Sequence, residues 1–150
     1  ISNFLSMPAT RGPGSLEWLL ELTDSIITYR SRYSRSPELL PVLDLLVFDD
    51  SNPQGVLFQA SVLARYLDRM ARELGETSES NLPDVLNRLR KFDMEKLVHL
   101  QFSDCQVCAP CAQLAALLKE LEGAAIQLSE WLGMRYFTHV GDVSRQTMAL

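Results

Sequence analysis

The chain has 150 residues, of which 47% are hydrophobic and 22% are charged, and its formal net charge is -5. This length predicts a single domain over residues 1–150 with one core. The acidic balance and the absence of a basic block argue against a nucleic-acid partner. No apolar run approaches the roughly 18 residues of a membrane span, so we expect no membrane partner either.

The start of the chain indicates a fragment of a longer protein. It begins at Ile1 without the charged and apolar segments of a secretion signal. Residues 1–14 include two prolines and two glycines and are expected to be flexible. The cysteines are few and odd in number, unlike a secreted disulfide framework, so the cytoplasm is the expected location.

The first long helix is predicted over residues 16–35. Ser15 suits the N-cap, and Ser36-Pro37 ends the helix because a residue before proline avoids helical angles. At about 100° per residue, Arg30 falls in the middle of a broad apolar arc, whereas Arg32 falls on the polar face. The arc consists of Leu16, Trp18, Leu19, Leu20, Leu22, Ile26, Ile27, Tyr29 and Tyr33.

Residues 39–48 are apolar nearly all round, which predicts a short buried helix. Its one interior charge is Asp44. An unpaired buried guanidinium is costly, and the connection between the two helices is short. The sequence therefore predicts an ion pair between Arg30 and Asp44.

Two interpretations of this pair remain open. The favoured one is structural: the pair fixes how the helices meet, with the Tyr29 and Tyr33 hydroxyls and Gln59 nearby. The alternative is an anion-binding pocket in which Arg30 and Arg32 hold a carboxylate or a phosphate.

A second long helix is predicted from Pro53 to Leu74. Asn52 suits its N-cap, Pro53 its first position and Gly75 the residue after its end. A polar loop is expected over residues 76–81.

The rest of the chain also favours helices. Pro83 opens a short helix, residues 94–102 predict another, and residues 111–137 predict a long one before an unpatterned tail at 141–150. No segment has the pattern of a strand. The expected fold is all-α, an antiparallel bundle of about five or six helices.

The cysteines suggest a further alternative. Cys105, Cys108 and Cys111 are spaced by three, as in zinc or iron–sulfur sites, but neither His99 nor His139 supplies a fourth ligand at a typical spacing. The second pair also has the spacing of a redox dithiol. Ordinary thiols are the favoured interpretation, followed by a metal site and then a redox role.

Five segments in the first half of the chain carry a resemblance to a known family. They are EWLLEL at 17–22, DSIITYRSRY at 24–33, VLDLL at 42–46, NP at 52–53 and FQ at 58–59. These segments, in this order, resemble the bacterial alpha-E domain, an all-helical family named for a Glu-Arg motif. The family's motif belongs to a helix upstream of these segments and is not found here, which indicates the C-terminal part of such a domain.

The resemblance implies an accessory, non-catalytic module of an ATP-grasp peptide or amide ligase system. The ligase domain would be the partner, in cis or in trans, and would bind ATP and Mg; no cofactor is expected in this domain, and a peptide is a candidate ligand. One alternative is part of an enzyme or anion-binding site that uses Arg30, Arg32, Tyr29, Tyr33 and Asp44. The other is the metal or redox module on the cysteines.

Overall fold

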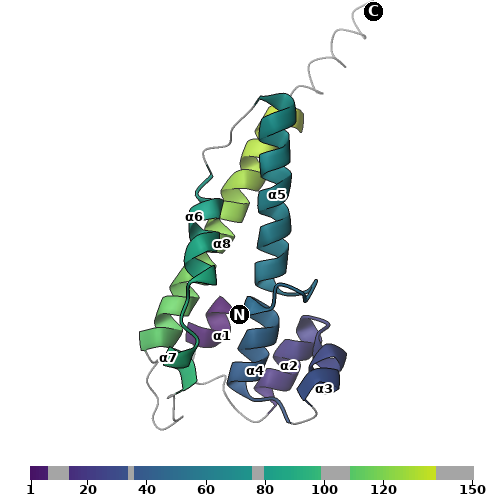
Figure 1. Cartoon of the computed structure of the whole chain (residues 1–150), viewed down its shortest axis with the longest axis vertical. Coiled ribbons are helices and arrows are strands. Elements are labelled where there is room, and N and C mark those ends of the chain that lie inside the picture. The colour runs from purple at the N-terminus through teal and green to yellow at the C-terminus, as the bar shows by residue number, and fades with distance from the viewer. Residues whose placement is uncertain (7–13, 34–35, 76–79, 99–108, 138–150) are drawn as a thin grey trace, which may run out of the picture.

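The computed structural model describes residues 1–6, 14–33, 36–75, 80–98 and 109–137. These residues form helices and turns and contain no strand, so the all-α class is confirmed (Figure 1). None of the described helices is both long and apolar enough to cross a membrane. The elements are α1 (Ser2–Ser6), α2 (Ser15–Leu22), α3 (Ile26–Tyr33), α4 (Leu39–Leu43), the π-helix η2 (Asp44–Phe48), α5 (Val56–Leu74), α6 (Leu82–Arg90), α7 (Glu95–Val98), α8 (Ala109–Leu132) and the π-helix η3 (Gly133–Phe137).

Three helices frame the molecule. The chain ascends in α5, descends in α6 and ascends again in α8 (Figure 1), and α6 packs against both long helices. At the lower end, α1 packs on α8, and η2 continues below α5. Helices α2 and α3 lie beside α4 at this end. Neighbouring helices of the frame are thus antiparallel, as expected for a bundle.

The helix predicted over residues 39–48 forms as α4 followed by η2 and is buried as expected. Apolar side chains around most of this segment bury it against its neighbours, although Asp44 stays exposed. Its buried residues are Leu39, Val42, Leu43, Leu45, Leu46 and Val47.

The helix predicted over residues 16–35 is broken in two, which corrects the sequence prediction. Helix α2 ends at Leu22, and Asp24 takes a left-handed conformation with φ of 52°. The Ser25 N–H then donates to the Leu20 carbonyl at 2.8 Å, and the Ser25 carbonyl accepts from the Tyr29 N–H at 2.8 Å in the first turn of α3. The break changes the helical phase, so side chains after it do not follow the predicted arc.

The start of α5 also differs from the prediction. The helix begins at Val56 rather than Pro53, and Asn52 is buried instead of capping it. The Asn52 amide donates to the Leu45 carbonyl at 2.9 Å, so it satisfies a backbone acceptor of η2. At the other end, Gly75 has φ of 65° and ends α5 as predicted.

The remaining predictions are met in part. Pro83 lies in the first turn of α6, and the long helix predicted over residues 111–137 forms as α8 and η3. Of the helix predicted over residues 94–102, the described part forms α7, and residues 99–102 lie outside the described part, as do 7–13, 76–79 and 138–150. Residues 1–14 were expected to be flexible but include α1, whose Leu5 is fully buried.

Candidate functional site

A polar cluster joins α3 to η2 and to the turn that follows it. The Arg32 guanidinium forms an ion pair with Asp49 and donates to the Ser51 hydroxyl at 3.3 Å. The Tyr33 hydroxyl donates to the Asp44 carboxylate at 2.9 Å. These contacts join residues 11 to 19 positions apart in the chain, so the cluster holds α3 in place.

The predicted ion pair between Arg30 and Asp44 is wrong. The Arg30 side chain is 67% exposed and faces the Glu17 carboxylate of α2 at 3.8 Å. Asp44 is also exposed, and its described partner is Tyr33. The break at residues 23–25 is the physical reason, because it turns Arg30 out of the apolar arc. Gln59 is not part of this cluster and instead donates to the backbone carbonyl six residues earlier at 2.6 Å.

Tyr29 is the member of the predicted set that lies in the core. Its ring is fully buried, and its centroid is 4.9 Å from that of Tyr33. The hydroxyl accepts from the Glu38 N–H at 3.1 Å and donates to the Ser36 carbonyl at 3.4 Å. Tyr29 therefore ties α3 to the start of α4.

Two pKa values in the polar cluster are shifted. Burial, the hydrogen bond to Asp44 and the Asp44 charge raise the pKa of Tyr33 to about 12. Burial would raise the pKa of Asp49, but hydrogen bonds from Ser51 and Arg32 outweigh it, so the pKa lies below its ordinary value. At neutral pH the cluster therefore holds a neutral tyrosine and a charged carboxylate, neither poised to exchange a proton.

Asp49 is expected to make stability depend on acid pH. Because the pKa of Asp49 is lower in the folded state, the charged carboxylate stabilises the fold fully above the ordinary aspartate value of about 3.9. This stabilisation is lost as the pH falls through the lowered pKa. We expect Asp49→Asn to lower the free energy of unfolding at pH 7 by about 1 kcal/mol and to flatten its fall below about pH 4. Urea unfolding at several pH values measures both. The exposed neighbour provides the control: Asp50→Asn should change neither quantity.

Of the three cysteines, the structure describes Cys111. Cys111 is fully buried in α8 and behaves there as a small apolar residue. Cys105 and Cys108 lie outside the described residues. Among the described residues, no group of three potential ligands is close enough to hold a metal ion. The metal and redox interpretations therefore remain predictions.

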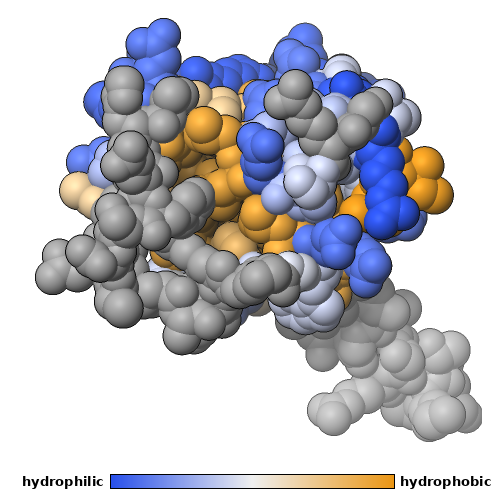
Figure 2. All heavy atoms as spheres, turned by 90° about the horizontal axis from the view of Figure 1, so that it is seen from below, coloured by the Kyte–Doolittle hydropathy of each residue, from blue (hydrophilic) through white to orange (hydrophobic). Residues whose placement is uncertain are grey.

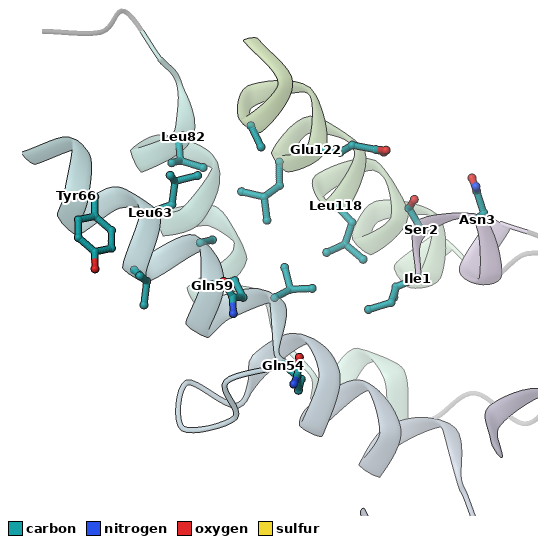
Figure 3. Close-up of a pocket in the computed structure, with 15 residues that line it drawn as sticks. Ile1, Ser2, Asn3, Gln54, Gln59, Leu63, Tyr66, Leu82, Leu118 and Glu122 are labelled. Carbon is teal, nitrogen blue, oxygen red and sulfur yellow. The ribbon is translucent and has the colours of Figure 1, made fainter. Parts of the chain in front are cut away.

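An apolar groove lies between α5 and α8, and the sequence did not single it out. Its volume is about 690 Å³. Side chains from four elements surround it: α5 and α8 form the walls, Leu82 of α6 lies at the back, and Ile1 and α1 close one side (Figure 3). Apolar side chains make up most of both walls, where Val56, Ala60 and Leu63 of α5 face Leu118, Leu121 and Ala125 of α8.

One charged side chain lines this groove, and two others line a hollow beside it. Glu122 lies on the α8 wall, near the α-amino group of Ile1; burial lowers the pKa of that amino group, and Glu122 acts in the opposite direction. On α5 the groove adjoins a hollow of about 240 Å³, and Tyr66 lines both. Arg65 and Arg69 line the second hollow.

The charged side chains at the groove and the hollow differ in whether they form an ion pair. Arg69 pairs with Glu73 one turn further along α5, at 2.8 Å. Neither Arg65 nor Glu122 forms a side-chain ion pair with any residue in the described part of the chain. Glu122 therefore lines the groove, whereas Arg65 and Arg69 line the neighbouring hollow instead.

Comparison with known proteins gives one result. Residues 3–137 match the family model Alpha-E, described as a predicted alpha-helical domain with a conserved ER motif. The match runs from α1 to the end of η3, well beyond the first half of the chain that carried the resemblance. The chain has no match among the curated proteins or the solved structures.

Proposed function

The chain belongs to the Alpha-E family, and on that premise we propose that it is a non-catalytic accessory module of an ATP-grasp peptide or amide ligase system. It docks on the ligase domain, either within one polypeptide or as a separate protein. ATP and Mg²⁺ bind to the ligase domain rather than to this module. The observation that carries the proposal is the open apolar groove between α5 and α8.

An open apolar groove favours docking over catalysis. Each Å² of apolar surface left in water forgoes about 25 cal/mol of stabilisation, so a partner that covers the groove walls gains by burying them. The groove walls carry mainly aliphatic side chains and no pair of ionisable groups placed for acid–base work. A partner that covers these walls removes them from water.

A second apolar surface lies at the far end of the molecule, on α2 and α3. Trp18 is 61% exposed, Leu22 is 66% exposed and Ile27 is 78% exposed. These positions were predicted to be buried, and the break at residues 23–25 explains why Ile27 is not. Figure 2 views this end and shows apolar surface between hydrophilic side chains. It is a competing docking surface, which the experiment below separates from the groove.

The alternative of an anion-binding site has weaker support. Arg32 is already paired with Asp49, and Arg30 with Glu17, on different sides of α3. A carboxylate or phosphate would have to displace both partners to be held by the two guanidinium groups together. The raised pKa of Tyr33 also keeps its hydroxyl protonated, so it does not act as a base at neutral pH.

Direct binding to the ligase domain tests the proposal. We expect the purified chain to bind the purified ATP-grasp domain encoded with it, in calorimetry at about 0.15 M salt, where surface charges are screened. Ala125→Trp fills the groove and should weaken binding at least tenfold, a change of about 1.4 kcal/mol. Ala116→Trp, at an exposed position of the same helix, is the matched control.

Two outcomes would contradict the proposal. Absence of binding between the folded domains rejects docking on the ligase. Binding that is lost in Trp18→Ser but kept in Ala125→Trp assigns docking to the α2–α3 surface instead of the groove. Circular dichroism of each variant shows whether the helices are intact.

A further inference from the structure

We propose that the outward face of α2 is a docking surface for a basic amphipathic helix of a partner protein. Two rows of side chains lie next to each other on this face, one apolar and one acidic. The rows consist of Trp18 and Leu22, and of Glu17 and Glu21. This surface includes no residue of the groove between α5 and α8, so binding here goes beyond the proposed function and does not depend on it.

The phase of α2 turns both rows toward water. Trp18 and Leu22 lie one turn apart and are mostly exposed, whereas Leu20, midway between them, points the opposite way and is fully buried. Glu17 and Glu21 are exposed as well. Each glutamate immediately precedes one of the apolar pair, so at about 100° per residue the acidic row runs along one side of the apolar row.

This face is unfavourable for the isolated chain in several respects. Glu17 and Glu21 repel each other one turn apart. Glu21 also lies in the last turn of α2, where the negative end of the helix dipole disfavours a carboxylate and no basic residue offsets it. The apolar row beside them forgoes the stabilisation of burial. Such conflicts with local stability are expected at functional sites, and a partner that is both apolar and basic relieves all of them.

The charges around the face favour a basic partner. Arg30 of α3 faces Glu17 at 3.8 Å, but both side chains are well exposed, so this pair is weak. Within the described part of the chain, neither Glu21 nor Asp24, which follows the end of α2, forms a side-chain ion pair. Lys or Arg side chains on the partner therefore meet acidic groups that the fold leaves unpaired.

The length of α2 limits the contact. Its eight residues span about 12 Å at 1.5 Å per residue, or roughly two helical turns. A partner helix matches both rows when its leucines recur at i and i+4 and its Lys or Arg residues occupy the neighbouring row. A contact this small belongs to the weak and transient class of interfaces, and we expect a dissociation constant of about 0.1 mM.

Titrations with synthetic helices test the proposal. The chain has two tryptophans, so Trp131→Phe leaves Trp18 as the reporter. Two peptides of about 14 residues share one leucine row and carry either Lys or Glu beside it. The Lys peptide should shift the emission of Trp18 to the blue and bind about tenfold more tightly than the Glu peptide at about 0.15 M salt. At about 1 M salt, where charges are screened beyond about 3 Å, the two affinities should converge.

A charge reversal makes the test independent of folding defects. In Glu21→Lys the preference should move to the Glu peptide, and a gain of binding cannot come from loss of structure. Lysine also suits the last turn of a helix, so this variant should fold. Glu130→Lys, at an exposed position of α8, is the matched control and should keep the preference for the Lys peptide. In Trp18→Ser, fluorescence anisotropy of labelled Lys peptide should show at least tenfold weaker binding.

Several results would overturn the proposal. It is wrong if neither peptide shifts the emission of Trp18 at concentrations up to about 1 mM, or if the preference ignores Glu21→Lys. Binding of the Lys peptide that survives Trp18→Ser places the peptide elsewhere and rejects the α2 surface. None of these measurements contains the ligase domain, so a failure of ligase binding and a failure of peptide binding are told apart.

Discussion

Replacing Gly55 by alanine is expected to lower the free energy of unfolding by about 1–3 kcal/mol, the usual result of overpacking. A Cβ atom at this position would lie 3.0 Å from the carbonyl oxygens of both Asp49 and Asn52, and 3.4 Å from that of Leu45. These are backbone atoms of η2 and of the connection from η2 to α5, so they cannot turn aside as a side chain could. Urea unfolding followed by circular dichroism measures the loss.

Gly123 provides a matched control for this prediction. It lies within α8, and a Cβ atom there would meet no neighbour within 4 Å. Gly123→Ala should therefore raise the free energy of unfolding by about 0.5–1 kcal/mol, through helix propensity alone. If Gly55→Ala is equally neutral or stabilising, the backbone at the start of α5 is not packed as closely as the structure indicates.

The sequence predicted the core helices well because their signals are local. Residues 39–48 form an apolar run without a polar face, and this pattern predicted their burial. Gly75 and Pro83 mark the end of α5 and the start of α6, since each acts through its own backbone. These predictions required no knowledge of what packs against each helix.

The break between α2 and α3 was missed because apolar residues continue on both sides of it. Thr23, Asp24 and Ser25 carried the signal that was overlooked. All three prefer helix ends to helix interiors, because their side chains compete for backbone hydrogen bonds. The Thr23 hydroxyl does so here, donating to the Leu19 carbonyl at 3.0 Å. Because the helix was predicted to be continuous, the orientation of Arg30 and its pairing with Asp44 were also predicted wrongly.

The groove was missed for a different reason. At helical spacing, Val56, Ala60 and Leu63 belong to one apolar stripe of α5. Helical spacing does not tell which part of a stripe another helix covers, since that depends on how helices far apart in sequence are placed. Here α6 covers one side of the stripe and leaves the side toward α8 open.

Replacing Tyr29 by alanine is expected to cost about 3–5 kcal/mol of unfolding free energy, as for other large buried aromatic residues. The ring is fully buried and packs on Tyr33, so its removal leaves a cavity between α3 and α4. Tyr29→Phe keeps the ring and removes the hydroxyl that accepts from the Glu38 N–H. It should cost about 1 kcal/mol, the net value of a typical hydrogen bond.

Tyr66 is the matched control for Tyr29, because its side chain is 61% exposed on α5. Tyr66→Ala should change the free energy of unfolding by no more than about 0.5 kcal/mol. Thermal and urea unfolding of the three variants give the order of their effects. If Tyr29→Ala costs as little as Tyr66→Ala, then α3 is not anchored through this ring. A cost of Tyr29→Phe close to that of Tyr29→Ala would assign the anchor to the hydroxyl and the start of α4 instead.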